Sequence, residues 1–100
     1  MPRVIEYFGF IFYFYAHDHL PIHVHVSKSG CETIFQLIYE NGNLKYIEER
    51  KSADIRPLNE KQKKEALKVI KLHADFITDS WTNFYAKGIT PKTMKITKEI

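Results

Sequence analysis

The sequence predicts a single α+β domain, with a mostly antiparallel sheet of four to five strands and one long C-terminal helix packed on one face. The period of the apolar residues changes once along the chain, from about two to about 3.6, and this order places the strands first and the helix last. With 100 residues, of which 44% are hydrophobic and 14% aromatic, the chain has enough apolar surface for one core. We expect residues 1–88 to form the domain and residues 89–100 to form a basic tail, either an edge strand or disordered.

The first strong strand signal is the apolar run from Phe8 to Tyr15, which we interpret as a central strand. A short strand over residues 4–7 precedes it, and Gly9 is interpreted as a bulge or bend between the two. Both faces of the central strand are apolar: Phe10, Phe12 and Phe14 on one, Ile11, Tyr13 and Tyr15 on the other. Because one helix covers one face only, we expect the tail, a second copy of the chain or another protein to cover part of the second face, and we predict a homodimer or a complex with another protein.

The next strand, residues 22–27, alternates between apolar and polar positions. Its apolar face carries Ile22, Val24 and Val26, so His23 and His25 lie together on the opposite face, about 7 Å apart at the rise of a strand.

A hairpin follows, formed by strands over residues 32–40 and 43–49. Asn41 and Gly42 between them both tolerate positive φ, which suits a tight type I′ turn. That turn predicts the register. Tyr39 is expected opposite Leu44 and Leu37 opposite Tyr46, with an apolar face of Phe35, Leu37, Tyr39, Leu44 and Tyr46.

The helix is expected from about Glu60 to Lys87, ending before Gly88. Asn59 and Gln62 have the spacing of an N-cap and capping box. The apolar stripe consists of Ala66, Ile70, His73, Ile77, Trp81 and Phe84, and the opposite face carries Lys61, Lys64, Lys68 and Lys71. We interpret His73 as a buried core histidine; the alternative is that it reaches the histidines of the strand, although the helix is expected to pack away from His23 and His25.

Composition and charge limit the cellular setting. Cys31 is the only cysteine, so no intrachain disulfide can form, and no N-terminal leader or membrane-spanning apolar run is apparent. We therefore expect a cytoplasmic protein. The net charge of +3 favours anionic partners such as nucleic acid or an acidic protein.

Four of the five histidines fall within nine residues, and this cluster is the candidate site. Imidazole can ligate a metal or transfer a proton near neutral pH. The first hypothesis is a site for zinc or another divalent metal formed by His17, His19, His23 and His25, with Asp18 orienting one ring.

The second hypothesis is metal-free acid–base cleavage of RNA by His19, His23 and His25. Lys28 or Arg3 would stabilise the phosphorane, and the helix lysines with the basic tail would contact phosphates. The third is a non-catalytic protein-interaction module, in which exposed aromatic residues such as Tyr7, Tyr13 and Tyr15 form the interface. For each hypothesis the alternative is structural: the histidines form a hydrated polar face, and the lysines form a solvated helix surface.

Two segments of the chain resemble a known family. Residues 1–5 and the motif Asp18-His19-Leu20-Pro21-Ile22-His23-Val24-His25-Val26, with His73 and Trp81 eight residues apart, resemble the small bacterial family catalogued as domain of unknown function 4160. The family signature reads His, any residue, Pro, Pro, His, Phe, His, Val. In this chain Ile22 replaces the second proline and Val24 the phenylalanine, while all three histidines are present.

The resemblance implies no established activity. Genes of that family often lie beside those of a second family, domain of unknown function 2442, in an arrangement like toxin–antitoxin pairs. The resemblance therefore implies one component of a two-gene module whose partner is a small protein encoded by the neighbouring gene.

Overall fold

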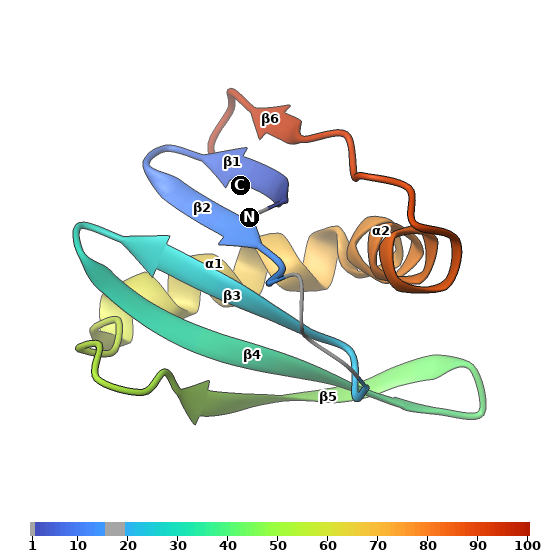
Figure 1. Ribbon diagram of the computed structural model, residues 1–100. Helices are drawn as coiled ribbons and strands as arrows, with labels where there is room; N and C mark the ends of the chain where they lie inside the picture. Colours follow the sequence, from blue (N-terminus) through green and yellow to red (C-terminus); the bar gives the residue numbers. More distant parts are fainter. Residues whose placement is uncertain (1, 16–19) are drawn as a thin grey trace.

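The computed structural model describes residues 2–15 and 20–100, and these form an α+β fold in which a mixed six-stranded sheet carries two helices on one face (Figure 1). The spatial strand order is β5-β4-β3-β2-β1-β6, and every neighbouring pair is antiparallel except β1 with β6. The elements are β1 (Arg3–Tyr7), β2 (Phe10–Tyr13), β3 (His23–Lys28), β4 (Cys31–Glu40), β5 (Asn43–Lys51), α1 (Glu60–Leu72), α2 (Ala74–Lys87) and β6 (Met94–Ile96). The α+β class is confirmed, but the predicted four to five strands were too few and the sheet includes a parallel pair.

Three two-residue turns join the first five strands into hairpins. Phe8–Gly9, Ser29–Gly30 and Asn41–Gly42 all have positive φ at both residues, as type I′ turns require. The predicted strand from Phe8 to Tyr15 was therefore wrong at its start, because Phe8 belongs to the turn; Gly9 forms the bend expected as one alternative, and not a bulge. Residues 3–7 and 10–13 are the two paired strands of that hairpin.

The register of β4 and β5 agrees with prediction next to the turn and departs from it further away. Tyr39 lies opposite Leu44 as expected, but a bulge follows in β5, so Ile47 and not Tyr46 faces Leu37. Tyr46 is consequently exposed, and Ile47 packs against the core in its place.

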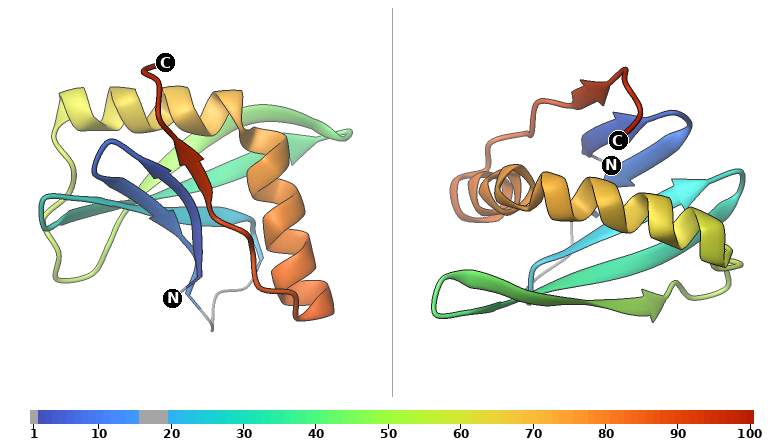
Figure 2. Two further views of the ribbon diagram at one scale, coloured as in Figure 1. Left: turned by 90° about the horizontal axis from the view of Figure 1, so that it is seen from above. Right: turned by 180° about the vertical axis from the view of Figure 1, so that it is seen from behind.

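The single long helix was also wrong, because the chain breaks at His73. This residue has φ −115° and ψ 27°, and it is at once the C-cap of α1 and the N-cap of α2. A straight helix over residues 60–87 would be about 42 Å long at a rise of about 1.5 Å per residue. The molecule measures 32 Å along its longest axis, so the apolar stripe stays on the core only by changing direction (Figure 2).

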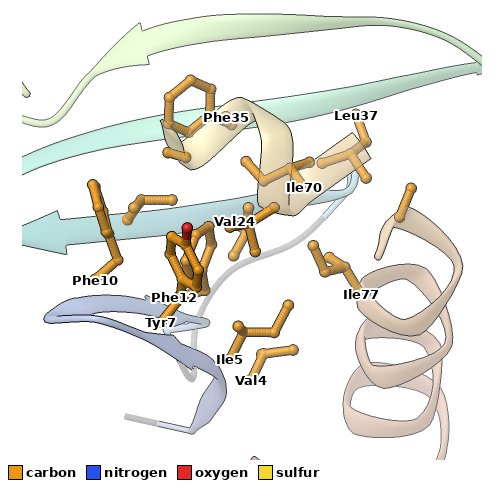
Figure 3. Packing of buried hydrophobic residues seen from close by; sticks show 14 of the residues in the cluster. Val4, Ile5, Tyr7, Phe10, Phe12, Val24, Phe35, Leu37, Ile70 and Ile77 are labelled. Atoms are coloured by element: carbon orange, nitrogen blue, oxygen red, sulfur yellow. The ribbon is translucent and has the colours of Figure 1, made fainter. Parts of the chain in front are cut away.

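The core lies between the sheet and the helices (Figure 3). Val24 and Val26 of β3 are fully buried, as the alternation in that strand predicts. Trp81 of α2 is also buried, as the helical spacing predicts. The largest fully buried side chains are Phe12, Phe14, Phe35, Ile5, Leu58, Ile70, Ile77, Val4, Val24, Val26, Val69 and Thr33.

The C-terminal segment returns to the sheet. Its strand β6 pairs with β1, and the Thr93 hydroxyl donates a hydrogen bond to the Arg3 carbonyl over 2.9 Å. Tyr13, on the second face of the predicted central strand, is 5% exposed within the single chain, so its burial does not require a second chain. Association with a second chain stays a prediction. None of the helices in the described ranges is long and apolar enough to cross a membrane.

Candidate functional site

His23 and His25 lie side by side on the face of β3 opposite Val24 and Val26. Their ring centroids are 5.3 Å apart with an interplanar angle of 62°. The side chains are not a hydrated surface, because His23 is 8% exposed and His25 only 4%. The other candidate ligands, His17 and His19, and the neighbouring Asp18 lie outside the described residues.

Two tyrosines of the β2 segment enclose the His25 ring. Tyr13 stacks on it with centroids 5.5 Å apart and an interplanar angle of 21°, and Tyr15 meets it edge-on at 4.2 Å. Tyr13 is the register partner of His25, so the pairing of β2 with β3 positions the stack. The sequence suggested these tyrosines for a protein interface, whereas the structure places them around a histidine.

Glu32 is the site residue that sequence reasoning missed. Its carboxylate is buried on β4, with Oε2 3.5 Å from His25 Nδ1. Oε1 accepts a hydrogen bond from the Tyr15 hydroxyl at 3.5 Å, and Oε2 accepts another from the Ser52 hydroxyl. A buried carboxylate needs such partners, since removal from water penalises its charge.

A signal for Glu32 was present in the sequence. The Ser29–Gly30 turn pairs Ser27 with Glu32, and alternation then puts Glu32 on the same face as His25. Recognising Ser29–Gly30 as a two-residue hairpin turn would have predicted that Glu32 lies beside the histidines.

The His23 ring is held from two sides. Its Nδ1 lies 2.8 Å from the Pro21 carbonyl oxygen, and because a carbonyl only accepts, Nδ1 carries the proton. Trp81 packs against the ring with centroids 5.0 Å apart. Nε2 is therefore the His23 nitrogen whose lone pair can bind a metal or accept a proton.

The contact between Trp81 and His23 corrects the expectation that the helix packs away from the histidines. The pairing of β2 with β3 ends at Tyr13 and His25, and Trp81 contacts residues beyond that point on both segments, Phe14 at 5.4 Å and His23 at 5.0 Å. The indole thus reaches the histidine face where the two strands separate. One turn later on α2, the Tyr85 hydroxyl donates to the carbonyl of Tyr15.

The cationic residues proposed for the site divide between the two faces of the sheet. Lys28 has the same parity on β3 as Val24, and its Nζ donates to the Phe8 carbonyl over 2.6 Å, so it faces away from His25. Arg3 is the register partner of Tyr13 and shares the histidine face. The helix lysines Lys61, Lys64, Lys68 and Lys71 are exposed on α1, on the other side of the sheet.

Two further residues singled out in the sequence have structural positions. His73 is half-buried at the junction of α1 and α2, where its backbone amide donates to the Val69 carbonyl. Cys31 is a half-buried free thiol at the start of β4.

Across residues 2–15 and 20–100, no three His, Cys, Asp or Glu side chains are grouped so that they could hold a metal ion. His23 and His25 could supply two ligands of a metal site, and the remaining ligands predicted from the sequence, His17 and His19, lie outside the described residues. The Glu32 carboxylate lies on the Nδ1 side of His25, with Oε2 3.5 Å from that nitrogen.

Comparison with known proteins assigns the chain to a family. No curated protein and no solved structure matches the chain. A family model described as Domain of unknown function (DUF4160) matches residues 9–82, which include β2 to β5, both histidines of β3, Glu32 and Trp81. The match spans most of the fold and the whole described site, and the chain belongs to the DUF4160 family.

Proposed function

We propose that this protein binds a divalent metal ion, zinc first among the candidates, through His23, His25 and at least one of His17 and His19. The observation that carries the proposal is the orientation of the two described rings. Metal-binding histidines usually give their second ring nitrogen to a carboxylate or a backbone carbonyl. His23 Nδ1 donates to a carbonyl and His25 Nδ1 faces the Glu32 carboxylate, so Nε2 is the metal-binding atom of both.

The ring spacing supports the same proposal. For two imidazole nitrogens about 2.0–2.1 Å from one zinc ion at a tetrahedral angle, the ring centroids are about 5.2 Å apart. The centroids of His23 and His25 are 5.3 Å apart. The surrounding aromatic rings exclude water, which suits a closed site.

The test is metal content and affinity of protein made without a histidine tag. We expect tight zinc binding by isothermal titration calorimetry. It should be lost in the His23→Ala/His25→Ala double variant and weakened about 10- to 100-fold by Glu32→Gln, because the ring loses its orienting carboxylate. His73→Ala is the matched control, since this histidine lies at the helix junction. Absence of tight binding in the wild type, or its survival in a folded double variant, refutes the proposal.

A second candidate function is metal-free cleavage of RNA, with His19, His23 and His25 as the catalytic residues. The buried Glu32 carboxylate 3.5 Å from His25 Nδ1 favours it, because a negative charge beside one ring nitrogen makes the imidazole a better base. The neutral imidazole of His25 would take the 2′-hydroxyl proton, and a second, protonated imidazole would give a proton to the leaving 5′-oxygen. The products would be a 2′,3′-cyclic phosphate and a 5′-hydroxyl.

Chelation separates the two candidates. Cleavage of a short oligoribonucleotide that persists in EDTA and falls at least about 100-fold in His25→Ala supports acid–base catalysis. Cleavage that is abolished by EDTA indicates a metal-dependent reaction and supports metal binding by the histidines instead. Cleavage at equal rates by wild type and His25→Ala identifies a contaminating nuclease and removes this candidate.

The third candidate is a non-catalytic interaction module that works with the product of a neighbouring gene, as in a toxin–antitoxin-like pair. Exposed aromatic side chains at two hairpins, Phe8 and Tyr46, support an interaction surface. Co-expression with the neighbouring gene product, followed by size-exclusion chromatography with light scattering, tests it. A stable complex that the Phe8→Ser/Tyr46→Ser variant loses supports this role, and two separate species contradict it.

A further inference from the structure

A groove opens on the histidine face of the sheet, outside the histidine site itself. Its volume is about 300 Å³, and it is lined by Arg3 of β1, Ile11 and Tyr13 of β2, and Ser27 of β3. The groove thus crosses three neighbouring strands on the face that the helices leave open. One wall, Tyr13, is also the ring that stacks on His25.

The two polar lining residues stand on opposite walls of the groove, Arg3 on β1 and Ser27 on β3, with the apolar surface of β2 between them. Arg3 and Ser27 supply a guanidinium and a hydroxyl, whereas Ile11 and Tyr13 supply apolar surface. None of these four side chains is a carboxylate. Small-molecule sites are typically mostly apolar with a few convergent polar groups, and this volume is at their lower limit.

The backbone of β1 presents Arg3 to the groove. A bulge between Arg3 and Ile5 buries both Val4 and Ile5, and it leaves Arg3 and Glu6 on the open face. Glu6 accepts one hydrogen bond from Arg3 Nη1 at 3.3 Å. A guanidinium has five N–H donors, and this one is 57% exposed, so most of its donors remain able to bind an anion.

We propose that this groove binds a small phosphorylated ligand of mononucleotide size. The phosphate lies on Arg3 at one wall, a flat organic group lies over Ile11 and Tyr13, and the Ser27 hydroxyl at the opposite wall binds a polar group of the ligand. Arginine binds phosphate through two parallel N–H donors, which fixes the direction of the ligand. The site stands independently of metal binding by the histidines, since none of its four lining residues is a candidate metal ligand.

The groove, and not the lysines of α1, lies where an anionic ligand could approach the histidines. The helix lysines are separated from His23 and His25 by the sheet, so they cannot guide a ligand to these residues. The groove lies on the same face and shares Tyr13 with the histidine site. Its arginine, Arg3, lies two strands from His25 in the same register row, with Tyr13 between them.

The test measures binding of uridine monophosphate, inorganic phosphate and uridine to the full chain by amide chemical shifts in NMR titrations. We expect uridine monophosphate to bind more tightly than either part alone, with the largest shifts at Tyr13 and Ser27. Arg3→Met should weaken binding at least about tenfold, because it removes charge-assisted hydrogen bonds. Glu6→Gln should strengthen binding, because it removes the carboxylate that competes for the guanidinium.

Arg50→Met is the matched control. Arg50 is an exposed arginine at the far edge of the sheet, where it donates to Gln36 at 3.4 Å. Equal losses in Arg3→Met and Arg50→Met mean nonspecific attraction and overturn the proposal. Equal affinities for uridine monophosphate and inorganic phosphate, or no binding at millimolar concentration, also overturn it. Spectra of the free variants show whether each is folded, and both substituted arginines are exposed, so loss of binding is separable from loss of fold.

Discussion

Replacing Trp81 by alanine tests how the second helix is joined to the sheet. The indole is 3% exposed and contacts Phe14, His23 and Tyr85 at centroid distances of 5.4, 5.0 and 4.2 Å. Burying a tryptophan removes roughly 200 Å² from water, which is worth about 5 kcal/mol at about 25 cal/mol per Å². Alanine retains part of this, and truncation of large aromatic residues in cores costs about 3–5 kcal/mol. We expect the free energy of unfolding to fall by about 4 kcal/mol.

The assay is urea denaturation followed by far-UV circular dichroism, because Trp81 is the only tryptophan and its fluorescence is lost with it. At about 4–8 °C per kcal/mol, the melting temperature should fall by roughly 15–30 °C. Lys64→Ala, an exposed position on α1, is the control and should change stability by less than about 0.5 kcal/mol. A loss below about 1 kcal/mol for Trp81→Ala would show that the indole does not fill the space between β2 and β3.

Three further predictions concern stability. Asn59→Ala should cost about 1 kcal/mol in a urea titration, because the Asn59 side chain accepts from the Gln62 amide at 2.8 Å and completes a capping box. A cost near zero would mean that α1 frays at its start. Gly30→Ala should cost about 1–2 kcal/mol, since φ is +81° and a Cβ there meets no atom within 4 Å, so the whole effect is backbone strain. Lys63→Met should remove an alkaline dependence of stability: the hydrogen bond that Lys63 Nζ donates to the Glu49 carboxylate raises the Lys63 pKa above 10.5, so the stabilisation is complete below pH 10.5 and is lost as pH rises through the higher folded value. Thermal melts between pH 8 and 12 should therefore converge for wild type and variant as pH rises, and a constant difference would contradict the assignment.

Sequence determined the features that depend on neighbouring residues. The change of apolar period separated strands from helices, and the capping box at Asn59 fixed where α1 begins. Alternation in β3 placed His23 and His25 on one face and Val24 on the other. Such features are readable because the backbone geometry of a strand or a helix turn follows from a few adjacent side chains.

Tertiary structure decided where distant segments meet. The stripe that includes Ile70, Ile77 and Trp81 is consistent with one straight helix, and only the size of the core requires a break at His73. The β5 bulge that exposes Tyr46 is likewise set by packing, because both registers satisfy the same turn.

The site shows the same division. Sequence located two of its imidazoles through their spacing on one strand, and the family match covers both of them. It did not indicate that Trp81 would reach His23, since this contact joins α2 to β3 across a separation of 58 residues and depends on where β2 and β3 separate. Glu32 differs, because the two-residue turn at Ser29–Gly30 is enough to place it on the face of His25. The packing of the whole chain fixes the position of Trp81, because a local pattern specifies which face a side chain takes but not which distant residue lies opposite it.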